Sequence, residues 1–221
     1  PYRYEYRSYN WSAAVTRAFG EAVIHRVSLG YEVSSVRANV LASDFVDQPV
    51  ARADFERNEL PRSEDTSAAV LGYRLLTTEY RVLRDVDTFD LREDQNVGPA
   101  LGATVVRSVP ALGSDQSFWR FGGSAGWTFV PGGDAIVQLA GSAEARLQEN
   151  GDVIDKRYIG DLQLATPMLL RVLRIVARAR TEQLVDNGRV RRLFLGGDTG
   201  LRGYPIGAFQ GRTWVRGNLE L

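Results

Sequence analysis

The residue best placed to do chemistry in this sequence is Arg202, which lies between small residues in the stretch Gly196 to Asn218. Glycines punctuate this stretch, and glycine permits positive φ and close backbone packing. An arginine in such a loop can be carried into a neighbouring cavity, where its guanidinium would form charge-assisted, bidentate hydrogen bonds with a carboxylate. The alternative is an arginine exposed to solvent. The candidate site is Leu201, Arg202, Gly203 and Tyr204.

Two stretches match catalytic motifs by letter alone. Residues 122–126 read G-x-S-x-G, but that motif needs a strand-to-helix turn, whereas strand-like alternation continues from Ser124 through Phe129. Residues 198–200 spell the D-T-G of aspartic proteases, and a single copy supplies one carboxylate where the mechanism needs two. We expect neither stretch to be catalytic and predict that the protein is not an enzyme.

The sequence also does not favour a metal or cofactor site. His25 is the sole histidine and cysteine is absent, so a transition-metal site lacks ligands, and His25 is interpreted as a packed or interfacial side chain. The acidic run from Asp85 to Asp94 lacks the glycine and the ligand spacing of an EF-hand. We interpret that run as a solvated turn.

Length and composition narrow the class of protein. The 221 residues fit one all-β domain, and 27 basic residues cancel 27 acidic ones, so no nucleic-acid partner is predicted. The absence of cysteine excludes a disulfide framework. The sequence has no run of about 18 apolar residues, so it predicts no membrane-spanning helix. A transmembrane β-barrel would also lack such a run. Because the chain begins at Pro1 and ends inside an alternating run, we expect a single-domain segment, residues 1–221, cut at both ends from a longer chain.

Alternation of apolar and polar residues predicts nine strands around the glycine-rich loop. They are expected near residues 2–17, 23–34, 67–84, 97–105, 119–129, 137–147, 157–164, 173–182 and 212–221. The polar, aperiodic residues 41–65 predict a long loop. In the first strand, Tyr2, Tyr4 and Tyr6 share one face.

The strand at 119–129 is the most informative. Trp119 and Phe121 share a face with Trp127 and Phe129, and the two pairs lie eight residues apart. That spacing is about 26 Å along a strand, or roughly 20 Å of depth after tilting, near the height of an apolar band between two aromatic girdles. The connections near residues 19, 86, 132 and 167 are expected to be short. Those at 41–65 and 186–211 are expected to be long. Short turns at one end of the strands and longer loops at the other are typical of an outer-membrane barrel.

The tetrad Leu201-Arg202-Gly203-Tyr204, with Gly196-Gly197 before it and Phe209 and Gly211 after it, resembles the V/L-R-G-F/Y hallmark of the sixth extracellular loop in the BamA/TamA superfamily of polypeptide-transporting outer-membrane barrels (bacterial surface antigen family). The motif identity covers about residues 192–221. The resemblance implies an antiparallel transmembrane β-barrel, of whose sixteen strands this segment would supply nine, in a Gram-negative-type outer membrane.

The same resemblance implies a role for the loop. It would fold back into the barrel lumen, where Arg202 would pair with a wall carboxylate and brace the barrel. The candidate partners are the inward acids Glu144, Asp161, Glu182 and Glu220, and which of them it meets is left open. The implied partners are outer-membrane lipids, client outer-membrane or secreted polypeptides, and periplasmic or lipoprotein assembly factors.

The inward face is also rich in arginine, at positions 120, 146, 157, 174, 178, 180 and 216. These residues could guide polypeptides or anionic groups. The interpretation we favour is that acids on adjacent strands neutralise them in a water-filled lumen.

The function implied by the resemblance is the folding, insertion or export of polypeptides at the outer membrane. Two alternatives stay open: a passive pore or structural surface antigen on the same wall, and a soluble β-sandwich enzyme with Ser124 as nucleophile.

Overall fold

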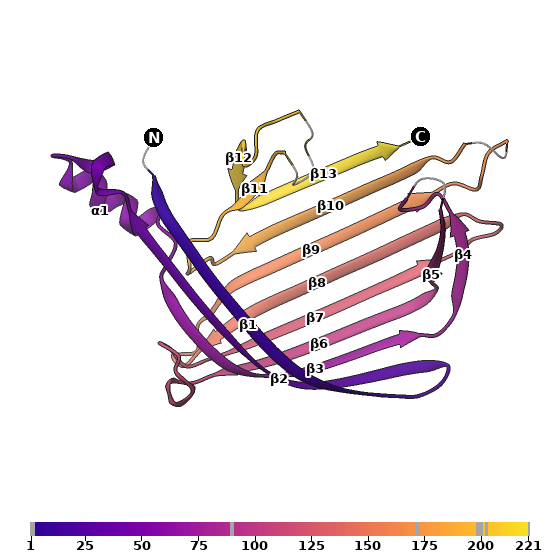
Figure 1. Cartoon of the computed structure of the whole chain (residues 1–221), viewed down its shortest axis with the longest axis horizontal. Helices are drawn as coiled ribbons and strands as arrows, with labels where there is room; N and C mark the ends of the chain where they lie inside the picture. The colour runs from indigo at the N-terminus through magenta and orange to yellow at the C-terminus, as the bar shows by residue number, and fades with distance from the viewer. Residues whose placement is uncertain (1–2, 89–90, 171–172, 198–200, 202, 221) are drawn as a thin grey trace.

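The computed structural model describes residues 3–88, 91–170, 173–197, 201 and 203–220 of the chain. The protein is mostly β and is built on one large antiparallel sheet of nine strands in the order β1-β2-β3-β6-β7-β8-β9-β10-β13 (Figure 1). These nine strands correspond to the nine predicted from alternation. The strand bounds are β1 Tyr4–Phe19, β2 Val23–Val40, β3 Glu64–Thr77, β6 Gly98–Ser108, β7 Phe118–Phe129, β8 Ile136–Gln148, β9 Val153–Ala165, β10 Val176–Val185 and β13 Thr213–Glu220.

Each strand pairs with the next main strand along the chain, so the sheet is an antiparallel meander whose edges are β1 and β13. Among the described residues the two edge strands do not pair, and the sheet is open. It is also strongly curled, since β1 and β2 cross the view steeply while β6 to β10 lie side by side (Figure 1). The longest strand, β2, has 18 residues, far more than the five or six of an average strand in a globular protein.

Directly paired residues share a face of the sheet, so the register assigns every strand position to one of two faces. The pairs Trp127 with Leu139, Val105 with Phe121 and Val15 with Leu29 all lie on one side, which we call the apolar face. The pairs Arg120 with Arg146 and Arg180 with Asp161 lie on the other, which we call the polar face. The predicted alternation therefore has one consistent sense across the sheet.

The structure corrects several details of the prediction. The third strand ends at Thr77 rather than near residue 84, because the side chain of Thr78 bonds to the carbonyls of Glu21 and Ala22 and turns the chain away. The residues that follow form a separate hairpin of β4 Tyr80–Arg84 and β5 Arg92–Asn96. The connection near residue 86 is consequently not short, since it runs from residue 78 to residue 97.

Further corrections concern the other end of the sheet. Residues 41–65 are not a plain loop, because they contain the 3-10 helix η1 Ala42–Phe45 and the helix α1 Pro49–Asn58. Pro49 stands in the first turn of α1, where its missing N–H costs nothing. In β1, Tyr4 and Tyr6 lie on the polar face, paired with Val40 and Ala38, while the exposed apolar side chains begin further along.

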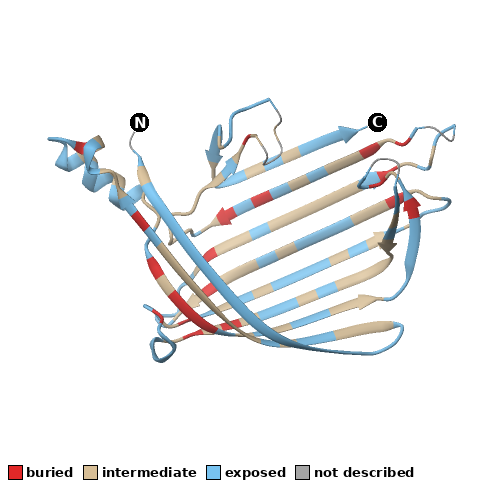
Figure 2. Cartoon of the chain, in the orientation of Figure 1, coloured by how far each residue is buried: buried red, intermediate tan, exposed pale blue. Residues whose placement is uncertain are grey.

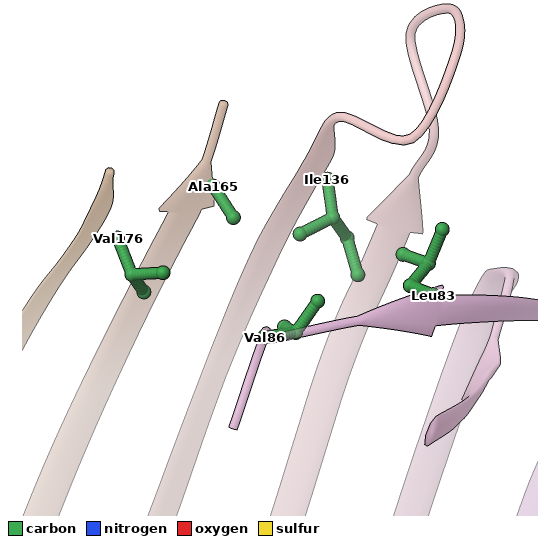
Figure 3. Packing of buried hydrophobic residues seen from close by; sticks show 5 residues of the cluster. All are labelled: Leu83, Val86, Ile136, Ala165 and Val176. Carbon is green, nitrogen blue, oxygen red and sulfur yellow. The ribbon is translucent and has the colours of Figure 1, made fainter. Parts of the chain in front are cut away.

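Buried residues gather at the two ends of the strands rather than in the middle of the sheet (Figure 2). At one end, Leu83 and Val86 of the β4–β5 hairpin pack against Ile136, Ala165 and Val176 from the ends of β8, β9 and β10 (Figure 3). These three sheet residues belong to the polar face, so the hairpin folds over that face. At the other end, the connection after β10 meets the β2–β3 connection: Arg62 N donates to the carbonyl of Arg189, and Arg192 pairs with Glu59.

The connection between β9 and β10 runs from residue 166 to residue 175, so it is not the short turn predicted near residue 167. Two other connections contain short elements of their own. The 3-10 helix η2 Pro110–Leu112 lies between β6 and β7, and a small sheet of β11 Leu193–Leu195 and β12 Phe209–Gly211 precedes β13. Asn150 and Gly151 form the predicted hairpin turn between β8 and β9, with Gly151 at φ +89° and its N–H bonded to the carbonyl of Gln148.

Candidate functional site

The polar face encloses an open cavity of about 770 Å³. Its floor is made of small side chains, such as Ser28, Ser124 and Ser142, together with glycines that leave the backbone uncovered. Added side chains would not fit everywhere, since a Cβ on Gly72 would lie 2.4 Å from the hydroxyl of Ser28. Charged residues, among them Arg74 and Glu144, stand at its margins. The cavity is therefore wide, polar and accessible to water.

Two ion pairs on the polar face join strands that are not neighbours in the sheet. Arg146 of β8 donates to both carboxylate oxygens of Glu64 at the start of β3, at 3.0 and 2.6 Å. Its side chain is only 3% exposed, and its guanidinium also lies 3.7 Å from the ring centroid of Phe118. Arg120 of β7 pairs with Glu32 of β2 at 2.6 Å. Such contacts tie the two sides of the curl together across the polar face.

The four acids predicted to face inward do lie on the polar face. Three of them pair with arginines of the wall: Asp161 with Arg180 at 3.2 Å, Glu182 with Arg157 at 2.7 Å, and Glu220 with Arg178 at 2.9 Å. Glu144 lines the cavity, and within the described part of the chain it has no hydrogen-bond or ion-pair partner. The neutralisation of inward arginines by acids on nearby strands is thus confirmed for these pairs.

The predicted loop motif is described only in part. Leu201 forms an isolated bridge with Gly197, whose N–H donates to the carbonyl of Tyr204 at 3.0 Å. Gly203 adopts φ +93°, and the Tyr204 ring packs edge-on against Phe209 with centroids 5.2 Å apart. Arg202 lies outside the described residues, so its contact with a wall carboxylate stays a prediction.

The glycines before the tetrad have the role expected of them. Gly196 and Gly197 have φ of +141° and +53°. A Cβ on Gly196 would lie 2.3 Å from the carbonyl oxygen of Pro205, and one on Gly197 would lie 2.7 Å from the side chain of Ile206. The loop closes on itself through this approach of its two arms. Tyr204 and Ile206 remain exposed.

The apolar face is exposed to an unusual extent. On β7, Trp119 stacks on Phe121 and Trp127 stacks on Phe129, with ring centroids 6.2 and 5.4 Å apart. All four rings are at least 40% exposed. Exposed large apolar side chains continue across the sheet at Trp11, Val15, Phe19, Val27, Leu29, Leu71, Tyr73, Leu101, Leu139, Tyr158, Leu164, Val215 and Leu219. A continuous apolar surface of this size marks contact with another apolar phase or partner.

The β4–β5 hairpin contributes carboxylates that the sequence suggested were merely solvated. Asp87 accepts hydrogen bonds from Gln163 of β9 and Gln95 of β5, both at 3.0 Å, and pairs with Arg178 at 3.2 Å. Burial would raise the pKa of Asp87, but these bonds outweigh it and hold the pKa below its usual range. The carboxyl therefore fastens the hairpin to the sheet.

Glu93 behaves in the same way inside the hairpin. Burial would raise its pKa, but hydrogen bonds from the hydroxyl and N–H of Thr88 and the N–H of Asp87 lower it.

Among the described residues no three histidines, cysteines or acids lie close enough to hold a metal ion.

The alternative with Ser124 as a nucleophile needs a base beside the hydroxyl, and no described histidine or carboxylate forms a hydrogen bond with Ser124. Ser124 lies in the middle of β7, as the alternation required. His25 lies on the opposite, apolar face, where its Nδ1 bonds with the Tyr73 hydroxyl at 2.8 Å and its ring stacks on Phe19. Asp198 lies outside the described residues.

Sequence reasoning missed the group of residues that holds the connection after β10. Arg189 donates from its backbone to Asp155 at 3.2 Å, and its guanidinium pairs with the same carboxylate at 2.8 Å. The side chain of Asp155 is 1% exposed. The cluster of arginines at 189, 191 and 192 was the available signal, since so many cations in one connection need anions nearby.

The chain matches no family model, and no curated protein matches it. Within the described residues, every helix is too short or too polar to span a membrane.

Proposed function

We propose that this chain forms part of the wall of a transmembrane β-barrel in a Gram-negative-type outer membrane. The apolar face contacts lipid and the polar face lines a water-filled lumen. Strands of 10 to 18 residues in β1, β2 and β7 to β10 are long enough for this role, because a transmembrane strand needs about 9–11 residues.

The observation that carries the proposal is the exposed apolar face. In a β-sandwich the apolar face would be covered by a second sheet, and the polar face would meet bulk water. Here Trp119 and Leu139 are 40% and 49% exposed, whereas the side chain of Arg146 on the opposite face is almost fully covered. That inversion suits a sheet with hydrocarbon outside and water inside.

We further propose that the barrel serves a protein assembly or translocation factor that folds, inserts or exports polypeptides. The support is the resemblance of Leu201-Arg202-Gly203-Tyr204 to the loop hallmark of the BamA/TamA superfamily, together with the compact, glycine-closed geometry of the loop around it. Lipids, client polypeptides and periplasmic or lipoprotein partners belong to this proposal. Its activity is mechanical and electrostatic rather than covalent.

The test of this function is client insertion by the full-length protein carrying Arg202→Ala. We expect client assembly to fall several-fold while the barrel keeps its heat-modifiable mobility in electrophoresis. The matched control is Arg212→Ala, an exposed arginine at the far end of the same connection, which should assemble clients normally. Normal assembly by Arg202→Ala would contradict the bracing role.

A passive pore on the same wall is the second candidate, and the cavity of about 770 Å³ favours it. Deleting residues 198–208 separates the two functions in one preparation. A pore keeps conducting ions in planar bilayers after the deletion, whereas an assembly factor loses client insertion.

A further inference from the structure

A second cavity lies where the connection after β10 approaches the opposite side of the curled sheet. Its volume is about 540 Å³. The start of β1 and the end of β2 form one wall, and residues 189–194 form the other. Because these segments come from opposite sides of the sheet, the cavity exists only in the curled form.

Four arginines line this cavity, at positions 62, 189, 191 and 192. Two of them are neutralised: Arg189 pairs with Asp155, and Arg192 pairs with Glu59. Arg62 and Arg191 have no ion-pair partner within the described part of the chain. Glu64 also lines the cavity, but its carboxylate is held by Arg146 from outside the lining. The cavity therefore has more positive charge than its own lining balances.

Arg191 is the most informative of the four. Its backbone is fixed on both sides, since its N–H donates to Asn187 Oδ1 and its carbonyl accepts from the same side-chain amide. Its Nε and Nη2 atoms are buried and make no hydrogen bond with any described residue. A buried guanidinium with unused donors is costly, and such groups are normally paired.

The surroundings of Arg191 do not relieve this cost. Burial lowers its pKa, and the nearby charge of Arg189 lowers it further. Asp155 and Glu144 offset part of this lowering through space, but Asp155 already holds Arg189, and neither carboxylate forms an ion pair with Arg191. An external anion is the partner that would use the free donors.

The rest of the lining indicates what carries that anion. Hydroxyl and amide groups of Tyr6, Ser8, Asn10 and Ser34 project from the polar face of β1 and β2. These groups suit a body with several hydroxyls, and Tyr4 and Phe194 add aromatic surface of the kind that packs against sugar rings. The volume is within the 300–1,000 Å³ typical of small-ligand pockets.

We propose that this cavity binds a phosphorylated sugar, with Arg191 and Arg62 contacting the phosphate and the β1–β2 wall contacting the sugar. Guanidinium groups bind phosphate oxygens in a bidentate manner, which lysine cannot reproduce. The site is formed by this chain alone and does not depend on the barrel being an assembly factor.

The experiment is a calorimetric titration of the folded protein in detergent micelles with glucose 1-phosphate, inorganic phosphate and glucose. We expect saturable binding of the sugar phosphate, weaker binding of phosphate, and none of glucose. Arg191→Gln should weaken binding about tenfold or more, and Arg191→Lys should recover only part of the loss. Arg81→Gln, on the exposed hairpin at the opposite end of the sheet, should bind as the wild type does.

Arg62→Gln gives a second route, because Arg62 is exposed and its loss should leave the fold intact. A phosphorylated glycolipid in the same micelles distinguishes the two sources of ligand. If it competes with the soluble sugar phosphate, the site takes lipid headgroups; if it does not, the site takes free sugar phosphates. Absence of saturable binding, or equal weakening in Arg81→Gln and Arg191→Gln, would overturn the proposal.

Discussion

The two faces of the nine-stranded sheet share one backbone but are stabilised in different ways. The polar face contains ion pairs that reach across the curl, such as Arg146 with Glu64, and it is covered at both ends by connections that fold over it. Within the described residues the apolar face is mostly uncovered, apart from contacts with the β6–β7 connection such as the bond from the Tyr31 hydroxyl to the carbonyl of Leu112, and rings such as Trp127 are about half exposed. Most arginines of the polar face are thus paired within the chain, with Arg191 as an exception, whereas the apolar side chains are left for an external phase.

The largest effect should come from breaking the covered ion pair on the polar face. Arg146→Ala leaves the Glu64 carboxylate covered, with only Arg189 at 4.0 Å as a remaining cation, and we expect this to cost about 3–5 kcal/mol of unfolding free energy. The measurement is urea unfolding of the folded protein in micelles. Arg180→Ala is the control, because its pair with Asp161 is about 40% exposed and should contribute about 1 kcal/mol or less. Equal losses of unfolding free energy in the two variants would show that the Arg146–Glu64 pair stabilises the protein no more than an exposed pair does.

A smaller effect should distinguish the two faces directly, using neighbouring residues of β8. Ala143 is exposed on the apolar face opposite Gly123, and Ser142 lies on the polar face and lines the cavity. Ala143→Arg should destabilise the protein in bilayers by about 2–4 kcal/mol, as a cation facing lipid does. Ser142→Arg should change stability by about 1 kcal/mol or less, because the cavity is wet and Glu144 is nearby. Unfolding in lipid vesicles measures both, and similar costs for the two variants would contradict the assignment of the faces.

The smallest effect concerns the hairpin that covers one end of the polar face. The pKa values of Asp87 and Glu93 are lowered in the folded protein, so their contribution to stability is present above their usual titration range and is lost as the pH falls from that range through the lowered pKa values. We therefore expect the hairpin to loosen below about pH 4, with the sheet intact. Hydrogen exchange of residues 78–97 at pH 7 and pH 3.5 measures this opening.

Asp87→Asn is the matched variant for the acid response, with the exposed Asp94→Asn as its control. The Asp87 variant should exchange faster already at neutral pH, and its acid response should shrink. Equal opening of the hairpin at both pH values, after correction for the intrinsic exchange rate, would show that these carboxyls do not fasten it to the sheet.

The strands and their faces were predictable because the signal is local. A period of two needs only a few consecutive residues, and on β7 it runs without a break from Trp119 to Phe129. The β4–β5 hairpin was missed because the alternation of β3 continues past Thr77, while the turn depends on bonds from Thr78 to residues 21 and 22. Helix α1 was missed because it is short and mostly polar, so its few apolar residues form no clear helical stripe.

The site was less predictable because its partners are distant in sequence. Glu144, Asp161, Glu182 and Glu220 could be placed inward by alternation, but their partners depend on the register of neighbouring strands. The pair of Arg146 with Glu64 joins residues 82 positions apart on non-adjacent strands, so no local pattern reports it. Arg202, the residue singled out first, keeps its predicted role as a proposal.

The environment of single tryptophans in lipid vesicles tests directly whether the apolar face contacts hydrocarbon. Three variants each retain one tryptophan: Trp119 or Trp127 on the apolar face, or Trp214, which pairs with Glu182 on the polar face. Brominated lipids should quench Trp119 and Trp127 strongly, most of all with bromine near the headgroups, while aqueous acrylamide should quench Trp214. Quenching of Trp119 and Trp127 by acrylamide, with no response to brominated lipid, would show that the apolar face does not contact lipid.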